Sequence, residues 1–454
     1  MVLLIYIYVE LNINNKSVFM MDDDTFFNFE DEVLNTLATK LSGFQTEHDI
    51  TGIIEKTAKI IDPEISKDDI ARLLKDANDF YPISKYIDND TVEDVMVNNT
   101  NNIFIYDTEK GATKVPEVIN DKRKLERLVR KFKMYATTVA ANKNIYDVHL
   151  PNKSRVNIVE SPLGADITIR NFKTKALSII DLINIGEMSY NMAGRFWLYA
   201  EGLKIRPANL LIAGMPAAGK TTLLNSMFSF FRPEQRIVTI EDTYELNTET
   251  QENCVRLETS TDISLEELVQ NALRMRPDML IVGEVRGKEA KDMMTAMNIG
   301  KISMSTIHAS TARDVITRLE HTPMNVEKDI IPLIDAIVLV SQINLDGKFT
   351  RKITQISEIS GIETQVLLSD LYRYDYKTRK GSDILPSVTY RDTLASLTGL
   401  PPSEIVREER RRSITLEAMN KKGIRNLTQI NEFCREYYDN PNRAMAKLEI
   451  AETV

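Results

Sequence analysis

The chain has 454 residues, too many for one compact core, so we expect two or three domains. Apolar residues make up 43% and charged residues 27% of it, as in ordinary globular proteins, and the formal net charge of -9 is spread along the chain. This balance argues against a broad nucleic-acid-binding face. The two cysteines, Cys254 and Cys434, are far apart and lack metal-ligand spacing, which predicts a reducing compartment, no disulfide framework and no zinc site.

The chain opens with an apolar run that ends at Glu10. The run is too short for a membrane-spanning helix, and it lacks the basic start and small-residue cleavage site of a signal peptide. Two interpretations stay open: a short β-strand, or a translated leader ahead of a start at Met20 or Met21. We expect a cytoplasmic protein that reaches a membrane only through a partner.

The pattern along the chain predicts an α/β protein with several parts. An acidic extension is followed by an α+β domain with strand-like runs, a linker with a helix around Trp197, a domain in which strands and helices alternate, and a helical region. A helix in the last region is expected after Pro401-Pro402, with Ser403 as its cap. The expected boundaries are 1–46, 47–172, 173–203, 204–365 and 366–454.

The stretch Leu210 to Thr222, L-L-I-A-G-M-P-A-A-G-K-T-T, has the pattern of a phosphate-binding loop between a buried strand and a helix. The two glycines would let backbone N–H groups converge on phosphate oxygens, while Lys220 meets the outer phosphates and the Thr221 hydroxyl meets Mg²⁺. The alternative is a glycine turn without a ligand. The predicted nucleotide contacts are Gly214, Met215, Pro216, Ala217, Ala218, Gly219, Lys220, Thr221 and Thr222.

Acidic residues follow two further predicted strands. Glu241-Asp242 comes after the β-like run that ends at Ile240, where a carboxylate would polarise the attacking water or hold a metal-bound water. The alternative is that Asp242 caps a helix or turn. Glu284 ends the apolar run that begins at Met279, and it is the expected metal-side carboxylate; a surface carboxylate is the alternative.

Three arginines flank Glu284 in the sequence. A helix with a Ser264–Glu267 capping box ends in R-M-R-P-D just before the strand, and a third arginine follows it. Arginine stabilises charge on a transferring phosphoryl group, but it more often makes structural ion pairs. Arg274, Arg276 and Arg286 are therefore candidate nucleotide contacts.

His308 ends the β-like run S-M-S-T-I-H-A. A histidine after a strand of a nucleotide-binding sheet could sense the terminal phosphate by hydrogen bonding, whereas a lone histidine is usually structural. The sequence leaves these two roles open.

These motifs, with I-V-T-I-E-D-T-Y-E-L, L-R-M-R-P-D-M-L-I-V-G-E-V-R-G-K-E-A and M-S-T-I-H-A-S-T-A, resemble the secretion ATPases of type II secretion, type IV pili and related filaments. The resemblance runs from about Asp147 to Ile362, and the region from Thr389 is similar to the helical tail of archaeal members and tight-adherence pilus motors. It implies a RecA-like ATPase domain, ATP and Mg²⁺, and a homo-hexamer acting on a polytopic membrane platform protein at the cytoplasmic membrane.

The resemblance also implies roles for individual residues. Lys220, Glu241, Glu284 and His308 would be catalytic, with Thr221 and Glu284 on the Mg²⁺ side. Arg155 and Arg170 match positions from which the amino-terminal domain reaches toward the phosphates, across a subunit boundary.

The sequence departs from the family pattern at three positions: Lys301 stands where a histidine is expected, His149 stands where an arginine is common, and Asn171 replaces a basic residue. The leading hypothesis is a motor that drives assembly or retraction of an archaeal-type or tight-adherence pilus, without direct nucleic-acid contact. The alternatives are a DNA-transfer ATPase and, because of Lys301, a nucleotide-gated scaffold with little hydrolysis.

Overall fold

A computed structural model describes residues 20–40, 47–87, 89–108, 110–136, 144–172, 176–260 and 262–450. The chain divides into two compact units, Met1–Thr174 and Lys175–Val454. The apolar opening run of the sequence lies outside the described residues. Among the described residues, no helix combines the length and the apolar character that crossing a membrane requires.

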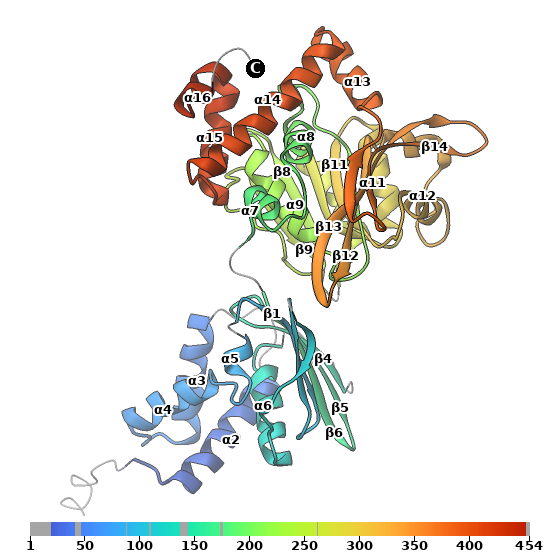
Figure 1. The fold of residues 1–454 in the computed structure, drawn as a ribbon. Coiled ribbons are helices and arrows are strands. Elements are labelled where there is room, and N and C mark those ends of the chain that lie inside the picture. The colour runs from blue at the N-terminus through green and yellow to red at the C-terminus, as the bar shows by residue number, and fades with distance from the viewer. Residues whose placement is uncertain are drawn as a thin grey trace, which may run out of the picture. The chain divides into compact units, whose positions relative to one another are not determined.

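The first unit packs helices against one face of an antiparallel sheet (Figure 1). The strand order is β3-β2-β1-β6-β5-β4. In β6 buried and outward-facing residues alternate, as expected for a sheet with one covered face. The elements are α2 (Asp23–Lys40), α3 (Glu47–Ile61), α4 (Lys67–Ala77), α5 (Ser84–Ile87), β1 (Val92–Asn98), β2 (Ile103–Asp107), β3 (Gly111–Lys114), α6 (Lys122–Lys133), β4 (Ile145–His149), β5 (Arg155–Ser161) and β6 (Gly164–Arg170).

The second unit is built on a nine-stranded sheet, in the order β15-β14-β13-β12-β7-β11-β10-β8-β9. Strands β12, β7, β11, β10, β8 and β9 run parallel, and β13 to β15 extend the sheet antiparallel. The strands are β7 (Leu210–Ala213), β8 (Ile237–Glu241), β9 (Cys254–Glu258), β10 (Met279–Val285), β11 (Ile302–Ile307), β12 (Ala336–Leu345), β13 (Lys348–Ile362), β14 (Val366–Asp375) and β15 (Lys380–Asp383).

Helices cover both faces of this sheet and make two hydrophobic cores. One core contains residues of α7, α8, α9 and the C-terminal helices, and the other contains residues of α10, α11 and α12. The helices are α7 (Ile179–Asn184), α8 (Tyr190–Glu201), α9 (Lys220–Met227), α10 (Leu265–Ala272), α11 (Glu289–Asn298), α12 (Ala312–Glu320), α13 (Thr389–Thr398), α14 (Pro402–Lys421), α15 (Leu427–Asp439) and α16 (Pro441–Lys447). The expected α/β fold with a preceding α+β domain and C-terminal helices is confirmed.

The boundaries of the second unit differ from the expected ones. Residues 366–383 form β14 and β15, because they pair antiparallel beside β13, and helices begin only at Thr389. The helix around Trp197 also belongs to this unit: the indole stacks on Phe230 and donates a 2.7 Å hydrogen bond to the Tyr438 hydroxyl. The segments expected as linker and helical region are therefore parts of one core.

The start of α14 differs from the expectation as well. Pro401 is its N-cap and Pro402 occupies the first turn, so Ser403 is already inside the helix and is not the cap. Proline suits the first turn because its fixed φ is helical and its missing N–H would have no partner there.

Candidate nucleotide-binding and catalytic site

The expected phosphate-binding loop lies at the carboxyl end of β7, a central strand of the parallel sheet. Residues Gly214 to Gly219 connect β7 to α9, whose first residue is Lys220. A Cβ atom at Gly214 would lie 2.4 Å from the Val340 carbonyl oxygen, so no larger residue fits there. Gly219 is left-handed, with a φ of 99°, and caps α9. The loop therefore curls at the amino end of a helix, as phosphate binding requires.

Three predicted residues form a connected chain at this edge of the sheet. The Lys220 Nζ lies 3.2 Å from Nδ1 of His308, and Nε2 of His308 lies 2.8 Å from a Glu284 carboxylate oxygen. A neutral imidazole with its proton on Nε2 satisfies both contacts, because Nδ1 then accepts from the ammonium and Nε2–H donates to the carboxylate. The structure thus brings together three predicted residues that come from three separate elements.

Lys220 also has a partner within the loop. Its ammonium donates to the Met215 carbonyl oxygen at 3.3 Å, and the side chain is largely buried. Burial lowers the pKa of Lys220, whereas Glu284 and Glu245 oppose this shift by favouring the charged form. A phosphate oxygen would accept a strong hydrogen bond from this largely buried ammonium, because a charge-assisted hydrogen bond is stronger where water is scarce.

The residues present fit a Mg²⁺ ion that accompanies ATP. Thr221 follows Lys220 in the first turn of α9, and Glu284 lies near the carboxyl end of β10, which β11 separates from β7. These are hard oxygen donors, the kind that Mg²⁺ prefers. Their role as metal-side residues stays a prediction.

Glu241, at the end of β8, is almost fully buried. One carboxylate oxygen accepts backbone hydrogen bonds of 2.8 Å from both Glu245 and Leu246, and the other lies 3.7 Å from the Arg256 guanidinium. Burial raises the pKa of Glu241 to about 7, against the opposing effects of the two N–H groups and Arg256. In this structure Glu241 braces the turn after β8, and its role as catalytic carboxylate stays a prediction.

The raised pKa of Glu241 predicts how stability depends on pH. The unfolded carboxyl titrates near 4.5 and the folded one near 7, so the folded state loses stability as the pH rises through this window. The Glu241 carboxyl should account for roughly 3 kcal/mol of the free energy of unfolding that is lost between pH 4.5 and 7.5. We expect this part of the loss to be absent in Glu241→Gln. Urea unfolding across this range measures it, and equal slopes for variant and wild type would contradict it.

Two of the three arginines near Glu284 in the sequence lie far from the loop. Arg274 and Arg276 are exposed and precede the amino end of β10, whereas Glu284 lies near its carboxyl end. A strand of this length separates its ends by roughly 20 Å. Within one chain they therefore do not reach a nucleotide at Lys220. Nearness in sequence was misleading because parallel strands present their ligands only at the carboxyl edge.

The third arginine, Arg286, lies at the correct edge. It forms an ion pair with Asp242, whose carboxylate also accepts a 3.2 Å hydrogen bond from the Thr259 hydroxyl. Asp242 therefore links the ends of β8 and β10. In this structure Arg286 makes the structural ion pair that the sequence left as its alternative.

Arg155 and Arg170 are in the first unit. They are directly opposite each other on β5 and β6, and they continue a row with His149 on β4 and Asp94 on β1. Because directly paired residues share a face of a sheet, this row faces away from the core. Arg155 approaches Asp147 at 3.6 Å and Arg170 approaches Asp94 at 3.3 Å. Their part in nucleotide binding stays a prediction.

Sequence reasoning missed one residue at the loop. The Arg351 Nε–H of β13 donates a 3.0 Å hydrogen bond to the Ala217 carbonyl oxygen. Arg351 belongs to no recognisable motif, and it lies more than a hundred positions after the loop. Only the antiparallel return of β13 beside β12 brings it there.

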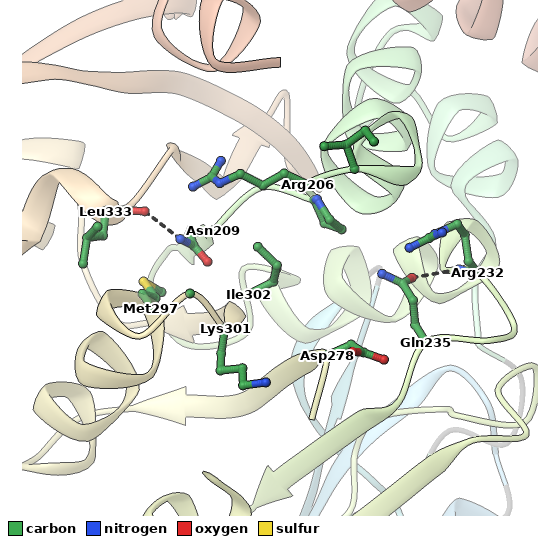
Figure 2. Close-up of a pocket in the computed structure, with 12 residues that line it drawn as sticks. Arg206, Asn209, Arg232, Gln235, Asp278, Met297, Lys301, Ile302 and Leu333 are labelled. Atoms are coloured by element: carbon green, nitrogen blue, oxygen red, sulfur yellow. Dashed lines mark hydrogen bonds between the residues drawn. The ribbon is translucent and has the colours of Figure 1, made fainter. Parts of the chain in front are cut away.

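Lys301, the departure in the histidine segment, lies before β11 and so at the opposite edge of the sheet from Lys220. It lines a cavity of about 440 Å³ (Figure 2). Lys301 and Asp278 are on one side of this cavity and Arg206 is on the other. Arg206 forms a 2.9 Å ion pair with Asp335. Lys301 therefore replaces no group of the Lys220–His308–Glu284 chain.

Comparison with known proteins shows the family of this chain. The chain belongs to the family described as "Type II/IV secretion system protein", which it matches over residues 76–380. This is the family that the sequence resemblance predicted.

Individual relatives align over part of their length. The chain is 36% identical to the uncharacterized protein MJ0781 of Methanocaldococcus jannaschii, over 47% of the chain and 31% of that protein. It is 33% identical to the conjugal transfer protein TrbB of Rhizobium radiobacter, over 44% of the chain and 61% of that protein. The chain thus spans less than two thirds of either relative. The structure of the Legionella pneumophila ATPase DotB aligns at 19% sequence identity, over 78% of this chain and 91% of DotB, with a TM-score of 0.45.

Proposed function

We propose that this chain hydrolyses ATP at the phosphate-binding loop and uses the energy to drive a secretion or pilus machine. The observation that carries the proposal is the chain of contacts from Lys220 through His308 to Glu284. It places a cation, a hydrogen-bonding imidazole and a carboxylate at one point beside the loop. Phosphoryl transfer needs such groups, because its catalysis rests on positioning and on stabilising charge.

The contacts suggest how the site responds to ATP. Lys220 exchanges the Met215 carbonyl for a phosphate oxygen, a better partner for an ammonium ion. Nδ1 of His308 then loses the Lys220 ammonium as its donor, while Nε2–H still donates to Glu284 and keeps the imidazole beside the loop. Bound Mg²⁺, held by Thr221 and on the Glu284 side, would neutralise charge on the phosphates.

In the proposed machine the chain is a homo-hexamer at the cytoplasmic face of a membrane, where it acts on a polytopic platform protein. Arg155 and Arg170 would reach the phosphates from a neighbouring subunit. The resemblance of the C-terminal helices to archaeal and tight-adherence motors favours a type IV-like pilus. Light scattering in the presence of ATP tests the ring: a mass of six chains is expected, and a monomer would contradict it.

The hydrolysis itself is tested with Glu284→Gln. The variant keeps the size of the side chain but removes the charge that faces His308 and Lys220. We expect the turnover number to fall about a hundredfold, with ATP affinity changed only a few-fold. Steady-state phosphate release and binding of a fluorescent ATP analogue measure the two quantities. Turnover at the wild-type rate would refute the proposed role of Glu284.

One alternative function has an observation in its favour. TrbB, by its name, is a conjugal transfer protein, so a DNA-transfer ATPase is the second candidate. Hydrolysis that DNA stimulates at low salt and not at high salt would favour it. The scaffold alternative rested on Lys301, which lies away from the loop. Tight ATP binding by the wild type without any turnover would still favour the scaffold.

A further inference from the structure

The phosphate-binding loop contains a strained residue with an external support. Ala217 has a φ of 60°, a left-handed conformation that a residue with a Cβ atom adopts reluctantly. Such a conformation persists where surrounding contacts hold it. The Arg351 bond to the Ala217 carbonyl oxygen is a contact of this kind, and it comes from outside the loop.

The bond fixes a whole peptide unit. Because the peptide is planar, the carbonyl of Ala217 and the N–H of Ala218 point in opposite directions. The carbonyl accepts from Arg351 at 3.0 Å, and the N–H donates to the Met215 carbonyl at 3.2 Å. That same Met215 oxygen accepts from Lys220. Arg351 is therefore joined through two hydrogen bonds to the carbonyl that Lys220 contacts.

Arg351 also lies against the last residue of the loop. A Cβ atom at Gly219 would be only 3.0 Å from Cδ of Arg351, so the absence of a side chain at Gly219 makes room for the arginine. On β13 the arginine is followed by Lys352, which bonds the Gly186 carbonyl, and by Ile353, whose N–H donates to the Glu187 carbonyl at 3.0 Å. These bonds attach this part of β13 to the segment before α8.

Glu187 adds electrostatic support to this arrangement. Its side chain is almost fully buried, and burial raises the pKa of its carboxyl to about 7, while Arg351 and Lys352 favour its ionised form. Arg351 therefore has a carboxylate in its electrostatic environment as well as the loop carbonyl.

We propose that Arg351 is a positioning residue of the ATP site, which holds the Ala217–Ala218 peptide in the conformation that receives the phosphates. The affinity for ATP then depends on β13, a strand outside the loop motif. This inference rests on ATP binding at the loop. If the loop loses its support, only a fraction of molecules is competent to bind, and the apparent dissociation constant rises by the inverse of that fraction.

Arg351→Met tests the proposal, since methionine keeps the unbranched chain and removes both the donor and the charge. We expect the dissociation constant and KM for ATP to rise about tenfold, with turnover at saturating ATP within about twofold of the wild type. In the protein without nucleotide, hydrogen exchange at the amides of Met215 and residues 217–219 should become faster. Arg351→Gln, which is polar but shorter, should behave in the same way.

Lys352→Met is the matched control. Lys352 is adjacent on the same strand and bonds the Gly186 carbonyl instead of the loop, so its loss should leave ATP affinity and loop exchange within twofold of the wild type. Reduced ATP affinity in Arg351→Met with unchanged loop exchange would overturn the positioning role, as would unchanged affinity. A wild type that binds no ATP would instead refute the proposed function, so the two failures are distinguishable.

Discussion

Replacing Lys220 with alanine is expected to remove both ATP binding and hydrolysis. The ammonium contacts Met215 and His308 in a largely buried position, and no described side chain of the loop can supply a second cation. Loss of one preorganised charge at a phosphoryl-transfer site lowers turnover by about a hundredfold to a thousandfold. We therefore expect phosphate release close to background and an ATP dissociation constant raised at least about tenfold.

Lys301→Ala is the control for this experiment. Both variants remove one lysine ammonium, but Lys301 lies at the opposite edge of the sheet. The Lys301→Ala variant should therefore hydrolyse ATP at a rate within about twofold of the wild type. Equal rates for Lys220→Ala and the wild type would contradict the assignment of the loop. A loss of activity in Lys301→Ala alone would move the site to the other edge.

Arg412→Met is expected to destabilise the second unit by about 3–5 kcal/mol. The guanidinium forms a 2.6 Å ion pair with Glu201 of α8 and a 3.0 Å pair with Glu408, and it donates a 3.1 Å hydrogen bond to the Trp197 carbonyl. The side chains of Arg412 and Glu201 are only 3% and 1% exposed. Removing the arginine leaves a buried carboxylate without its counter-charge, which costs far more than an exposed pair contributes.

The same helix supplies the control. Arg407 pairs with Glu404 at 2.8 Å on the exposed side of α14, and Arg407→Met should cost no more than about 1 kcal/mol. Denaturant unfolding followed by tryptophan fluorescence measures both variants, because Trp197 is the single tryptophan and lies in this core. A similar small loss for both substitutions would show that the buried pair does not hold α14 to α8.

The sequence predicted the centre of the site better than its surroundings. Lys220, Glu284 and His308 each follow or end a β-like run, and parallel strands bring their carboxyl ends to one edge, so local patterns sufficed. Arg351 could not be found in this way, because its contact depends on the antiparallel pairing of β13 with β12. Arg274 and Arg276 were close to Glu284 in the chain, but the length of β10 separates them from the loop.

The same reasoning explains the fold boundaries. The strand, helix and capping box from Asn209 to Pro277 follow from local periodicity and turn residues. The packing of α14 along α8 is a long-range contact, whereas β13, β14 and β15 form successive hairpins whose strand pattern the expectation of a helical region missed. Buried ion pairs such as that between Glu201 and Arg412 have no local signal either, since more than two hundred residues separate the partners.

The most direct test of the central claim is a structure of the protein with Mg²⁺ and a non-hydrolysable ATP analogue. We expect the phosphates between the loop and the amino end of α9, with the Lys220 ammonium moved from the Met215 carbonyl to a phosphate oxygen. Glu284 and His308 should face the terminal phosphate. An analogue bound instead in the cavity beside Lys301, or phosphates that leave Lys220 on Met215, would contradict ATP hydrolysis at this loop.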